Sequence, residues 1–352
     1  MRILFLTRKF PPQKGGMETF SWELTENYAG PKTIIHYGQR KLDILWAAPL
    51  LCVRALFLSR RVDLIHLGDL VLGPIAIILK WFMQKPIVVT VHALELTFNS
   101  IPGYQWLIRR SLRSINHFVA VSDFTADLLK KNGIPAEKIS IITHGVVQPP
   151  VIDRTQARKK LAARFSLPTE KPWLLTVGRL VRRKGVAWFI EHVFAKLPQP
   201  LPIYLIVSTG PEKEQIESLI QQLNLAHHVR LLGKVTDEEL RFLYSAADLF
   251  VMPNINVDGD AEGFGFVAIE AAAYGLPVIA SRIDGIPSAI ADQHNGILIT
   301  PGDTEAYTNA VLTWLNHPAQ RQTFGKTAAA YTREHSRWED VAAQYKKLFE
   351  RL

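Results

Sequence analysis

Residues 262–280 form the stretch EGFGFVAIEAAAYGLPVIA. It predicts a glycine-rich loop, then a helix that ends at Gly275, then a short apolar strand. The three alanines at 271–273 allow this helix to lie close to a sheet. Loop, helix and strand in this order are typical of a parallel sheet that helices cover on both faces.

The same alternation of strand and helix extends outward through both halves of the chain. The predicted strands are residues 3–7, 33–37, 62–66, 87–91, 118–121 and 139–142, then 173–177, 203–207, 229–232, 249–252, 278–280 and 297–299. Several are continuous apolar runs, which indicates parallel strands buried on both faces. We therefore predict an α/β protein with two doubly wound, Rossmann-like domains whose strand ends face a ligand-binding cleft.

The domain boundaries follow from proline and charge. Residues 1–150 are expected to form the first domain and residues 165–336 the second. Between them, Gln148-Pro-Pro150 and a polar, basic helix to about Arg164 are interpreted as the linker. A last helix over 337–352 has no strand after it, so we expect it to pack back on the first domain.

Composition narrows the class of protein. The chain has 352 residues, of which 48% are hydrophobic and 21% charged, so it is neither disordered nor a coiled coil. Its single cysteine, Cys52, cannot form an internal disulfide, which favours a reducing compartment. The start of the chain has no secretory pattern, and the longest apolar stretch, 70–83, is shorter than a bilayer requires. We expect a cytoplasmic protein.

The net charge is +9, and +8 of it falls in residues 1–150. Such asymmetry predicts an anionic partner for the first domain. The cations there alternate with aromatic residues, as in a helix that lies in a membrane interface. The residues concerned are Arg40, Lys41, Trp46, Arg54, Phe57, Arg60, Arg61, Trp106, Arg109, Arg110 and Arg113. Peripheral contact with the inner face of the membrane and an ordinary solvated surface both fit this pattern. Nucleic acid is not expected, because no recognition module is present.

Two carboxylates frame the helix of the opening stretch. Glu262 precedes it and Glu270 lies about one turn inside, so both could accept hydrogen bonds from the hydroxyls of one bound molecule. Gly265 lies at the helix start, where the free N–H groups near Phe266 and Val267 can meet a phosphate.

Two further loops carry candidate phosphate ligands. The segment GRLVRRKG at 178–185 follows a strand, and its Arg179 and Lys184 would suit a diphosphate, while Arg182 and Arg183 are expected to be solvated. Near the start, Gly15 and Gly16 lie between the first strand and the first helix. They fit a phosphate loop and a simple turn equally well.

His92 follows a buried strand and is either a structural hydrogen-bond donor or a contact to a sugar hydroxyl. Asp258 and Asp260 have a spacing that can hold Mn²⁺, but a solvated acidic loop is the favoured interpretation, so no metal is expected. Gly-x-Gly-x-x-Gly, the Walker loop and Gly-x-Ser-x-Gly are all absent, which argues against a dinucleotide enzyme, a P-loop NTPase and a serine hydrolase.

Taken in order, these motifs resemble the retaining glycosyltransferases of the GT-B fold, of the family 4 type. The resemblance covers nearly the whole chain. It includes Pro-Pro-x-x-Gly-Gly-Met-Glu near the start, Thr90-Val-His92, Gly145-Val146, Gly178-Arg-Leu with Lys184-Gly, and Glu262 with Glu270. The spacing from Met252-Pro253 to Glu262 is especially similar to that of phosphatidylinositol and phosphatidylinositol-mannoside mannosyltransferases. Two segments depart from the family pattern, His144-Gly-Val-Val147 and Asp284-Gly-Ile-Pro-Ser288.

The resemblance implies a role for each candidate residue. The second domain would bind a nucleotide diphosphate sugar and the first domain the acceptor. Gly16, Arg179 and Lys184 would hold the diphosphate, and Gly265 and Phe266 would complete that site. Glu270 would bind the ribose and Glu262 the sugar hydroxyls, with His92 facing the sugar across the cleft.

The activity implied is transfer of a hexose, of mannose or glucose type, to an acceptor hydroxyl with retention, in glycolipid or polysaccharide synthesis. The acceptor could be lipid-linked, GDP-mannose is favoured over a UDP-sugar as donor, and no other cofactor is expected. A nucleotide-sugar epimerase, a phosphorylase on the same fold and a non-enzymatic two-domain binding protein are the alternatives.

Overall fold

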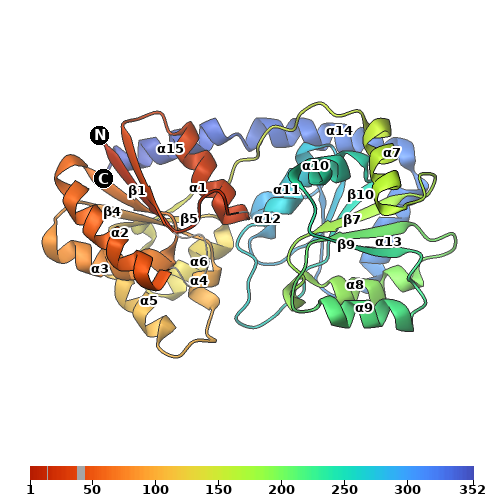
Figure 1. The fold of residues 1–352 in the computed structure, drawn as a ribbon, viewed down its shortest axis with the longest axis horizontal. Helices are drawn as coiled ribbons and strands as arrows, with labels where there is room; N and C mark the ends of the chain where they lie inside the picture. The colour runs from red at the N-terminus through yellow and green to blue at the C-terminus, as the bar shows by residue number, and fades with distance from the viewer. Residues whose placement is uncertain (14, 38–43) are drawn as a thin grey trace. The chain divides into compact units, whose positions relative to one another are not determined.

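The computed structural model describes residues 1–13, 15–37 and 44–352, with residues 44–48 and 59 described by their backbone alone. The described chain forms two compact units (Figure 1). Unit 1 consists of Met1–Gly145, Asp258–Phe264 and Ser336–Leu352, and unit 2 of Val146–Val257 and Gly265–His335. Each contains a six-stranded parallel sheet with helices on both faces, which confirms the predicted pair of doubly wound α/β units.

The sheet of unit 1 has the strand order β2-β1-β3-β4-β5-β6. Its strands are β1 (Ile3–Thr7), β2 (Lys32–His36), β3 (Leu64–Leu67), β4 (Ile87–Val91), β5 (His117–Ala120) and β6 (Ile139–Ile141). The buried side chains of β1, β3 and β4 alternate between the two faces of the sheet, so each strand contributes to two cores.

One face of this sheet packs on an aliphatic core. Leu4 and Leu6 lie there with buried side chains of four helices. These helices are α2 (Ile44–Leu58), α3 (Gly73–Phe82), α5 (Tyr104–Leu112) and α6 (Asp123–Lys131). The basic residues Lys14, Arg40 and Lys41 lie outside the described residues.

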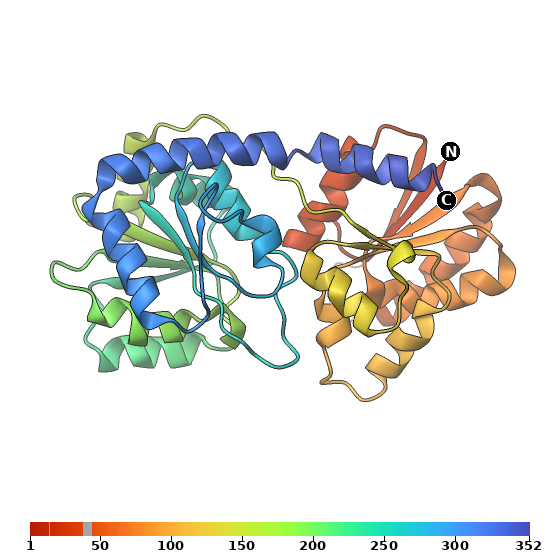
Figure 2. The ribbon, with the colours of Figure 1, turned by 180° about the vertical axis from the view of Figure 1, so that it is seen from behind.

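The opposite face is aromatic and is covered by α1 (Gly16–Asn27) and α15 (Trp338–Phe349) (Figure 2). The ring of Phe5 contacts those of Tyr28 and Phe349 at centroid distances of 5.4 and 6.2 Å. Thr90 Oγ1 and the Tyr345 hydroxyl are hydrogen-bonded at 2.8 Å, which links β4 to α15. The last helix therefore packs on the first domain, as predicted.

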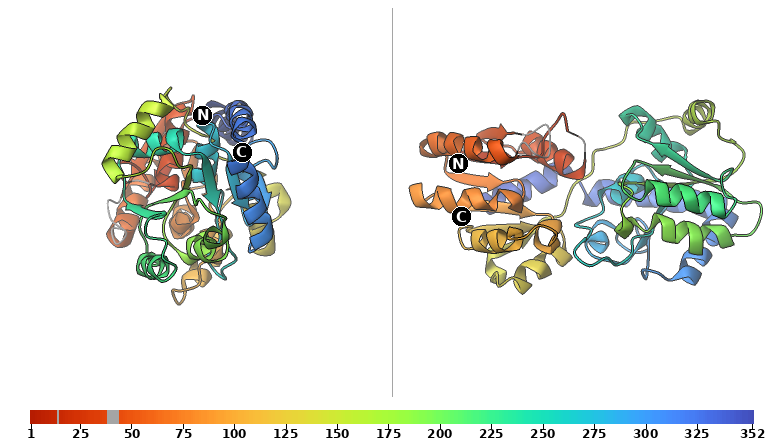
Figure 3. Two further views of the ribbon diagram at one scale, coloured as in Figure 1. Left: turned by 90° about the vertical axis from the view of Figure 1, so that its right-hand side faces the viewer. Right: turned by 60° about the horizontal axis from the view of Figure 1, so that its bottom comes forward.

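The sheet of unit 2 has the strand order β12-β11-β10-β7-β8-β9. Its strands are β7 (Trp173–Val177), β8 (Ile203–Val207), β9 (Val229–Gly233), β10 (Leu249–Met252), β11 (Val278–Ser281) and β12 (Ile297–Ile299). One face packs on α8 (Val186–His192), α9 (Lys213–Gln222) and α13 (Thr304–Asn316), of which α8 and α9 lie side by side (Figure 3).

Besides the short α12 (Ile286–Ala289), four longer helices complete unit 2. They are α7 (Arg154–Phe165), α10 (Asp237–Ala246), α11 (Phe266–Ala273) and α14 (Pro318–His335). α10 begins with a capping box, because Thr236 and Glu239 each accept the backbone N–H of the other. The interpretation of α7 as a linker is wrong. It packs against α10 and buries Ala157 and Leu161, whose small apolar face is hard to recognise in a mostly polar helix.

Both sheets have a switch point, where consecutive connections leave the central strand in opposite directions. In unit 1 the central strand is β1, between β2 and β3, and in unit 2 it is β7, between β8 and β10. The carboxyl ends of strands at such a point leave room for a ligand. Among the described helices, none is both long and apolar enough to cross a bilayer.

Candidate active site

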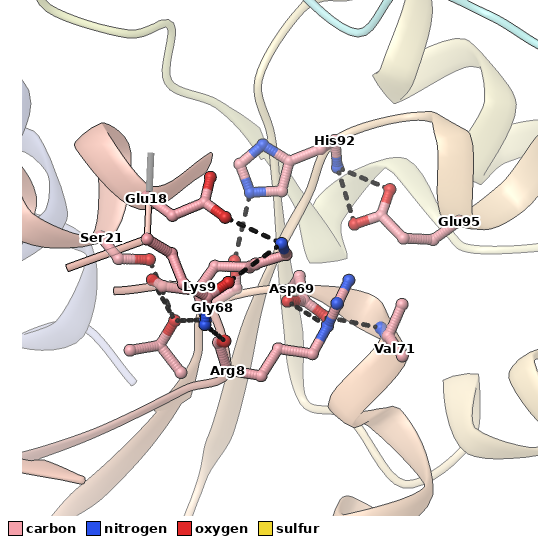
Figure 4. Close-up of polar contacts among 11 residues, drawn as sticks. Arg8, Lys9, Glu18, Ser21, Gly68, Asp69, Val71, His92 and Glu95 are labelled. Atoms are coloured by element: carbon pink, nitrogen blue, oxygen red, sulfur yellow. Dashed lines mark hydrogen bonds and ion pairs between the residues drawn. The ribbon is translucent and has the colours of Figure 1, made fainter. Parts of the chain in front are cut away.

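The switch point of unit 1 carries a partly buried ion pair (Figure 4). Arg8 follows β1 directly and Asp69 lies two residues after β3. The Arg8 Nε lies 2.9 Å from Asp69 Oδ2, and the Asp69 side chain is fully buried. Asp69 also caps the next turn, since its Oδ1 accepts the backbone N–H of Val71 at 2.9 Å. This carboxylate fixes the guanidinium of Arg8 at the strand ends.

The loop after β1 carries a second pair. Lys9 Nζ lies 2.8 Å from Glu18 Oε1, in the first turn of α1. Gly15 is the N-cap of this helix, and a Cβ at Gly15 would lie 2.6 Å from Glu18 Oε2. The start of α1 therefore already holds a carboxylate of this chain. A phosphate near Gly15 and Gly16 would have to share the position with Glu18, which makes these two glycines the weaker phosphate candidates.

His92 lies one residue beyond β4 in a strained backbone. Ala93 has φ +75° and ψ −53°, and the N–H of Leu94 donates to the His92 carbonyl, which together form a γ-turn. The His92 ring is buried and its Nε2 lies 3.1 Å from the carbonyl oxygen of Gly68, at the end of β3. Strain of this kind concentrates at functional sites.

The Glu95 side chain is hydrogen-bonded to this turn. Its carboxylate accepts the backbone N–H of His92, with Oε2 at 3.1 Å and Oε1 at 3.3 Å. Burial raises the pKa of Glu95, and the nearby Asp69 carboxylate adds to the rise. Arg8, Asp69 and Glu95 thus form a buried charged cluster that the sequence analysis did not single out. Each is a polar residue soon after a strand, and that position is the signal that could have found them.

The segment with Glu262 belongs to unit 1. Asp258–Phe264 packs there, although its neighbours in the chain belong to unit 2. A Cβ at Gly263 would lie 2.2 Å from the His92 carbonyl oxygen, so only glycine allows this approach. Residues some 170 positions apart in sequence, His92 and Glu262, therefore lie in one neighbourhood. Asp258 and Asp260 flank Gly259, which approaches Asn99.

His144, one of the departures from the family pattern, lies in the same neighbourhood. Its ring stacks on that of His92, with centroids 5.6 Å apart and an interplanar angle of 12°, and packs edge-on against Phe264 at 4.8 Å. Burial lowers the pKa of His144, and the nearby His92 lowers it further. The neutral imidazole acts as an aromatic spacer that supports His92.

Lys184 lies at the switch point of unit 2. The loop after β7 runs from Gly178 to Gly185, and the Lys184 side chain folds back against Gly178, 3.3 Å from where a Cβ would be. Only 8% of Lys184 is exposed, whereas Arg179 is exposed. The Arg183 carbonyl accepts the N–H of Ile255 at 2.9 Å, which joins this loop to the one after β10.

α11 begins just after the loop that follows β10. Its N-cap is Gly265, with φ +101°, and Phe266 and Val267 are its first two residues. Backbone N–H groups at a helix start are not used by the helix's own hydrogen bonds. Those of Phe266 and Val267 are the donors that the sequence predicts for a phosphate.

Glu270 lies one turn further along α11. The Tyr244 hydroxyl donates to Glu270 Oε2 at 2.9 Å. Burial raises the pKa of Glu270 to about 7, while the hydrogen bond from Tyr244 opposes the rise. The carboxyl group thus changes its protonation near neutral pH, and its ionised form is the better acceptor for a hydroxyl.

We expect Glu270→Gln to stabilise the protein above neutral pH. A raised carboxyl pKa means that the folded state binds a proton more tightly than the unfolded state. The wild type therefore loses stability as pH rises from 4.5 to about 7, by about 3 kcal/mol. The glutamine lacks this titration, so its free energy of unfolding should exceed the wild-type value at pH 8 and match it at pH 5. Urea unfolding at both pH values measures the difference. Parallel pH dependence of the two proteins would refute it.

The predicted site residues divide between the two units. Gly15, Gly16, His92 and Glu262 belong to unit 1, and Arg179, Lys184, Gly265, Phe266, Val267 and Glu270 belong to unit 2. In each unit they lie in loops or helix starts that follow the carboxyl ends of strands. Among the described residues, no cluster of three or more His, Cys, Asp or Glu could hold a metal ion.

Two protein-family models match the chain. Residues 6–147 match Glycosyltransferase Family 4, and residues 157–331 match Glycosyl transferases group 1. Together the two matches include every predicted site residue. The segment Asp258–Phe264, which belongs to unit 1, falls within the second match.

Among the relatives is a GDP-mannose-dependent α-(1-6)-phosphatidylinositol monomannoside mannosyltransferase of Mycolicibacterium smegmatis. It is 24% identical, over 98% of this chain and 97% of its own. A D-inositol 3-phosphate glycosyltransferase of Corynebacterium urealyticum is 30% identical over 61% of this chain and 51% of its own. The two relatives differ in the acceptor that their names state.

Solved structures share the fold. The sucrose-phosphate synthase of Thermosynechococcus elongatus superposes with a TM-score of 0.81 at 24% identity, over 99% of this chain and 98% of its own. Anabaena HepE in complex with UDP-glucose gives 0.80 at 20% identity over the full length of both chains. With both domain families matched in order, the chain belongs to the GT-B-fold glycosyltransferases that combine a family 4 domain with a group 1 domain.

Proposed function

We propose that the protein is a retaining hexosyltransferase that moves mannose or glucose from a nucleotide diphosphate sugar to an acceptor hydroxyl. Unit 2 binds the donor and unit 1 the acceptor. The observation that carries the proposal is Lys184, a buried cation at the switch point of unit 2. A desolvated ammonium group at the carboxyl ends of parallel strands suits a diphosphate.

The leaving group is the nucleoside diphosphate. Negative charge grows on its phosphate as the glycosidic bond breaks, and Arg179, Lys184 and the first N–H groups of α11 stabilise that charge. Attack comes from the same face as the departing phosphate, which then accepts the acceptor's proton. Glu270 binds the ribose hydroxyls.

The buried cluster of unit 1 supports recognition of hydroxyl groups. Carboxylates and guanidinium groups fixed by mutual ion pairs offer acceptors and donors in set positions, at little cost in side-chain entropy. Within unit 1, Glu262, His92, Arg8 and Asp69 contact hydroxyl groups of the bound substrate.

Donor identity is tested by thermal shift with GDP-mannose, UDP-glucose, UDP-N-acetylglucosamine and ADP-glucose, with and without EDTA. A ligand that binds only the folded state raises the melting temperature. We expect the largest shift with GDP-mannose, a smaller one with the UDP-sugars and no effect of EDTA. No shift with any donor would contradict the proposal.

The reaction is tested with the preferred donor and a panel of lipid-linked and soluble acceptors, reading the anomeric configuration of the product by NMR. Retention gives the α-linked product from the α-linked donor. A β-linked product would refute the retaining mechanism. Conversion of UDP-N-acetylglucosamine without an acceptor would instead indicate an epimerase.

The mannosyltransferase of Mycolicibacterium smegmatis is named for an acceptor that is a phosphatidylinositol derivative. In this chain, unit 1 has a surface that fits an anionic membrane. Four aromatic side chains of this unit are highly exposed, with exposed fractions of 80% for Phe57, 82% for Trp81, 69% for Phe82 and 68% for Trp106. They lie on α2, α3 and α5, and α3 packs against both of the other helices. Lys80 and Lys85 flank Trp81 and Phe82 in the sequence. We infer peripheral contact at the inner face of the membrane.

The double substitution Trp81→Ala with Phe82→Ala is expected to lower binding to vesicles that contain phosphatidylglycerol about ten-fold or more. The variant lacks the two aromatic rings that the membrane interface buries in the wild type. Co-sedimentation measures the bound fraction. Trp22→Ala is the matched control, since Trp22 is an exposed aromatic residue on α1, on the opposite face of the sheet. Equal loss with both variants would contradict the membrane surface.

A further inference from the structure

Unit 2 contains a second concave site, on the opposite edge of its sheet. A pocket of about 640 Å³ lies beside Asp248 and Pro277, the residues just before β10 and β11. The pocket therefore lies at the amino ends of these strands, whereas Lys184 and the start of α11 lie at the carboxyl ends. Its volume is in the range of small-molecule sites.

The pocket wall carries an excess of positive charge. Arg154, Arg321, Lys326 and Arg333 line it, and Asp248 is the only carboxylate among the lining residues. Asp248 itself pairs with three guanidinium groups, those of Arg154 at 2.6 Å, Arg158 at 3.0 Å and Arg321 at 2.9 Å. It also accepts the backbone N–H of Trp173. One carboxylate with four donors has no capacity left for the remaining cations.

Two of these arginines have a structural role as well. Arg158 donates to the carbonyl of Ala246, and Arg321 to that of Trp314. Burial lowers the pKa of both guanidinium groups, and the neighbouring arginines lower it further. The cluster thus bears uncompensated positive charge that an anion would relieve.

The other cations are available to a ligand. Arg154 is bound only to Asp248, and Lys326 and Arg333 have no ion-pair partner within the described part of the chain. Lys326 and Arg333 lie with Gln322 and Ala329 along one stripe of α14, at helical spacing. Gly325 contacts Gly275 so closely that a Cβ would lie 2.1 Å from the Gly275 carbonyl oxygen, which fixes this stripe beside the end of α11.

The rest of the wall is apolar or aromatic. Pro149 and Pro150 line one side, and Tyr244 and Tyr274, whose ring centroids are 5.4 Å apart, line another. Cations beside a partly apolar wall suit a molecule with a phosphate group and a compact organic part. A groove that holds only water would require neither a cluster of cations nor an apolar wall.

We propose that this pocket binds a phosphorylated small molecule, at a site separate from the donor site. Arg154, Lys326 and Arg333 hold the phosphate, and Tyr274 packs on the organic part. The assignment does not depend on the proposed donor site, because the two groups of cations share no residue.

Calorimetric titration with pyrophosphate at low salt tests the site. Pyrophosphate is a probe that both groups of cations can bind. We expect two classes of binding site in the wild type. Lys326→Ala with Arg333→Ala should weaken one class at least ten-fold and leave the other, and Lys184→Ala should do the reverse. The matched control, Lys159→Ala with Lys196→Ala, removes two exposed lysines that do not line the pocket and should keep both classes.

The outcomes separate the two proposals. If the Lys326 and Arg333 variant binds pyrophosphate as the wild type does, or if Lys184→Ala alone abolishes all binding, the pocket proposal is wrong. If Lys184→Ala changes nothing while the double variant loses its class, the pocket stands and the donor site is in doubt. Circular dichroism of each variant verifies that it is folded.

Discussion

Lys184→Ala is expected to lower kcat/KM with the preferred nucleotide-sugar donor about 100- to 1,000-fold, the range seen when one fixed electrostatic contact to a developing charge is removed. The effect is large because Lys184 is buried, so its charge is poorly screened by water. Since the phosphate gains charge in the transition state, kcat should fall as well as affinity. Initial rates over a range of donor concentrations separate the two.

Arg182→Ala is the matched control. Arg182 is a cation on the same turn, η5 (Arg182–Lys184), but its side chain is exposed. We expect its kcat/KM to stay within about two-fold of wild type, since an exposed charge is screened. Equal losses in the two variants would indicate a general effect of charge and would count against a specific diphosphate contact.

Asp248→Asn should lower the free energy of unfolding by about 3–5 kcal/mol, the usual cost of removing one partner from a buried ion pair. The neutral amide leaves three guanidinium groups close together without a counter-charge. It also places an N–H₂ group among donors, so a hydrogen bond to Arg158 or to the Trp173 N–H is lost. Urea unfolding followed by circular dichroism measures the change.

Glu217→Gln provides the comparison within the same unit. Glu217 pairs with Lys213 at 3.0 Å on the exposed surface of α9, where a pair contributes at most about 1 kcal/mol. We expect its unfolding curve to overlay that of the wild type. A loss below 1 kcal/mol for Asp248→Asn would mean that the arginines separate without cost, and that the cluster is not under electrostatic strain.

The strands were the most predictable part of the fold. The predicted bounds 3–7, 87–91, 173–177, 203–207, 249–252 and 297–299 are those observed. A parallel strand buried on both faces is a continuous apolar run that ends where polar loops begin, so its limits are visible in the sequence. The pair of sheets follows from the repetition of that pattern.

The helices were less predictable, and for a physical reason. α13 and α14 cover the second unit without having been singled out, and α7 was interpreted as a linker. The buried face of α7 consists of Ala157 and Leu161, and that of α14 is mostly alanine, threonine and glycine, so both carry a weak hydrophobic signal. Only tertiary packing reveals which side of such a helix is buried.

The site was partly predictable. Segments such as 178–185 and 262–270 stand out, because glycine, cations and carboxylates follow strands there. Arg8, Asp69 and Glu95 did not stand out, since each is a single charged residue whose neighbours come from other strands. The approach of Gly263 to His92 also requires the folded chain, because it joins segments from opposite ends of the sequence.

The interleaving of the two units has a consequence for synthesis. Unit 1 is completed only by residues 258–264 and 336–352, so the ribosome makes its last helix after the whole of unit 2. Until α15 emerges, the aromatic face of the first sheet, with Phe5 and Phe20, lacks the cover of Tyr345 and Phe349. We expect unit 2 to reach its native state first, although it starts later in the chain. A nascent chain halted before Ser336 would then have a folded second unit and an exposed aromatic surface on the first. Such a surface binds chaperones or causes aggregation.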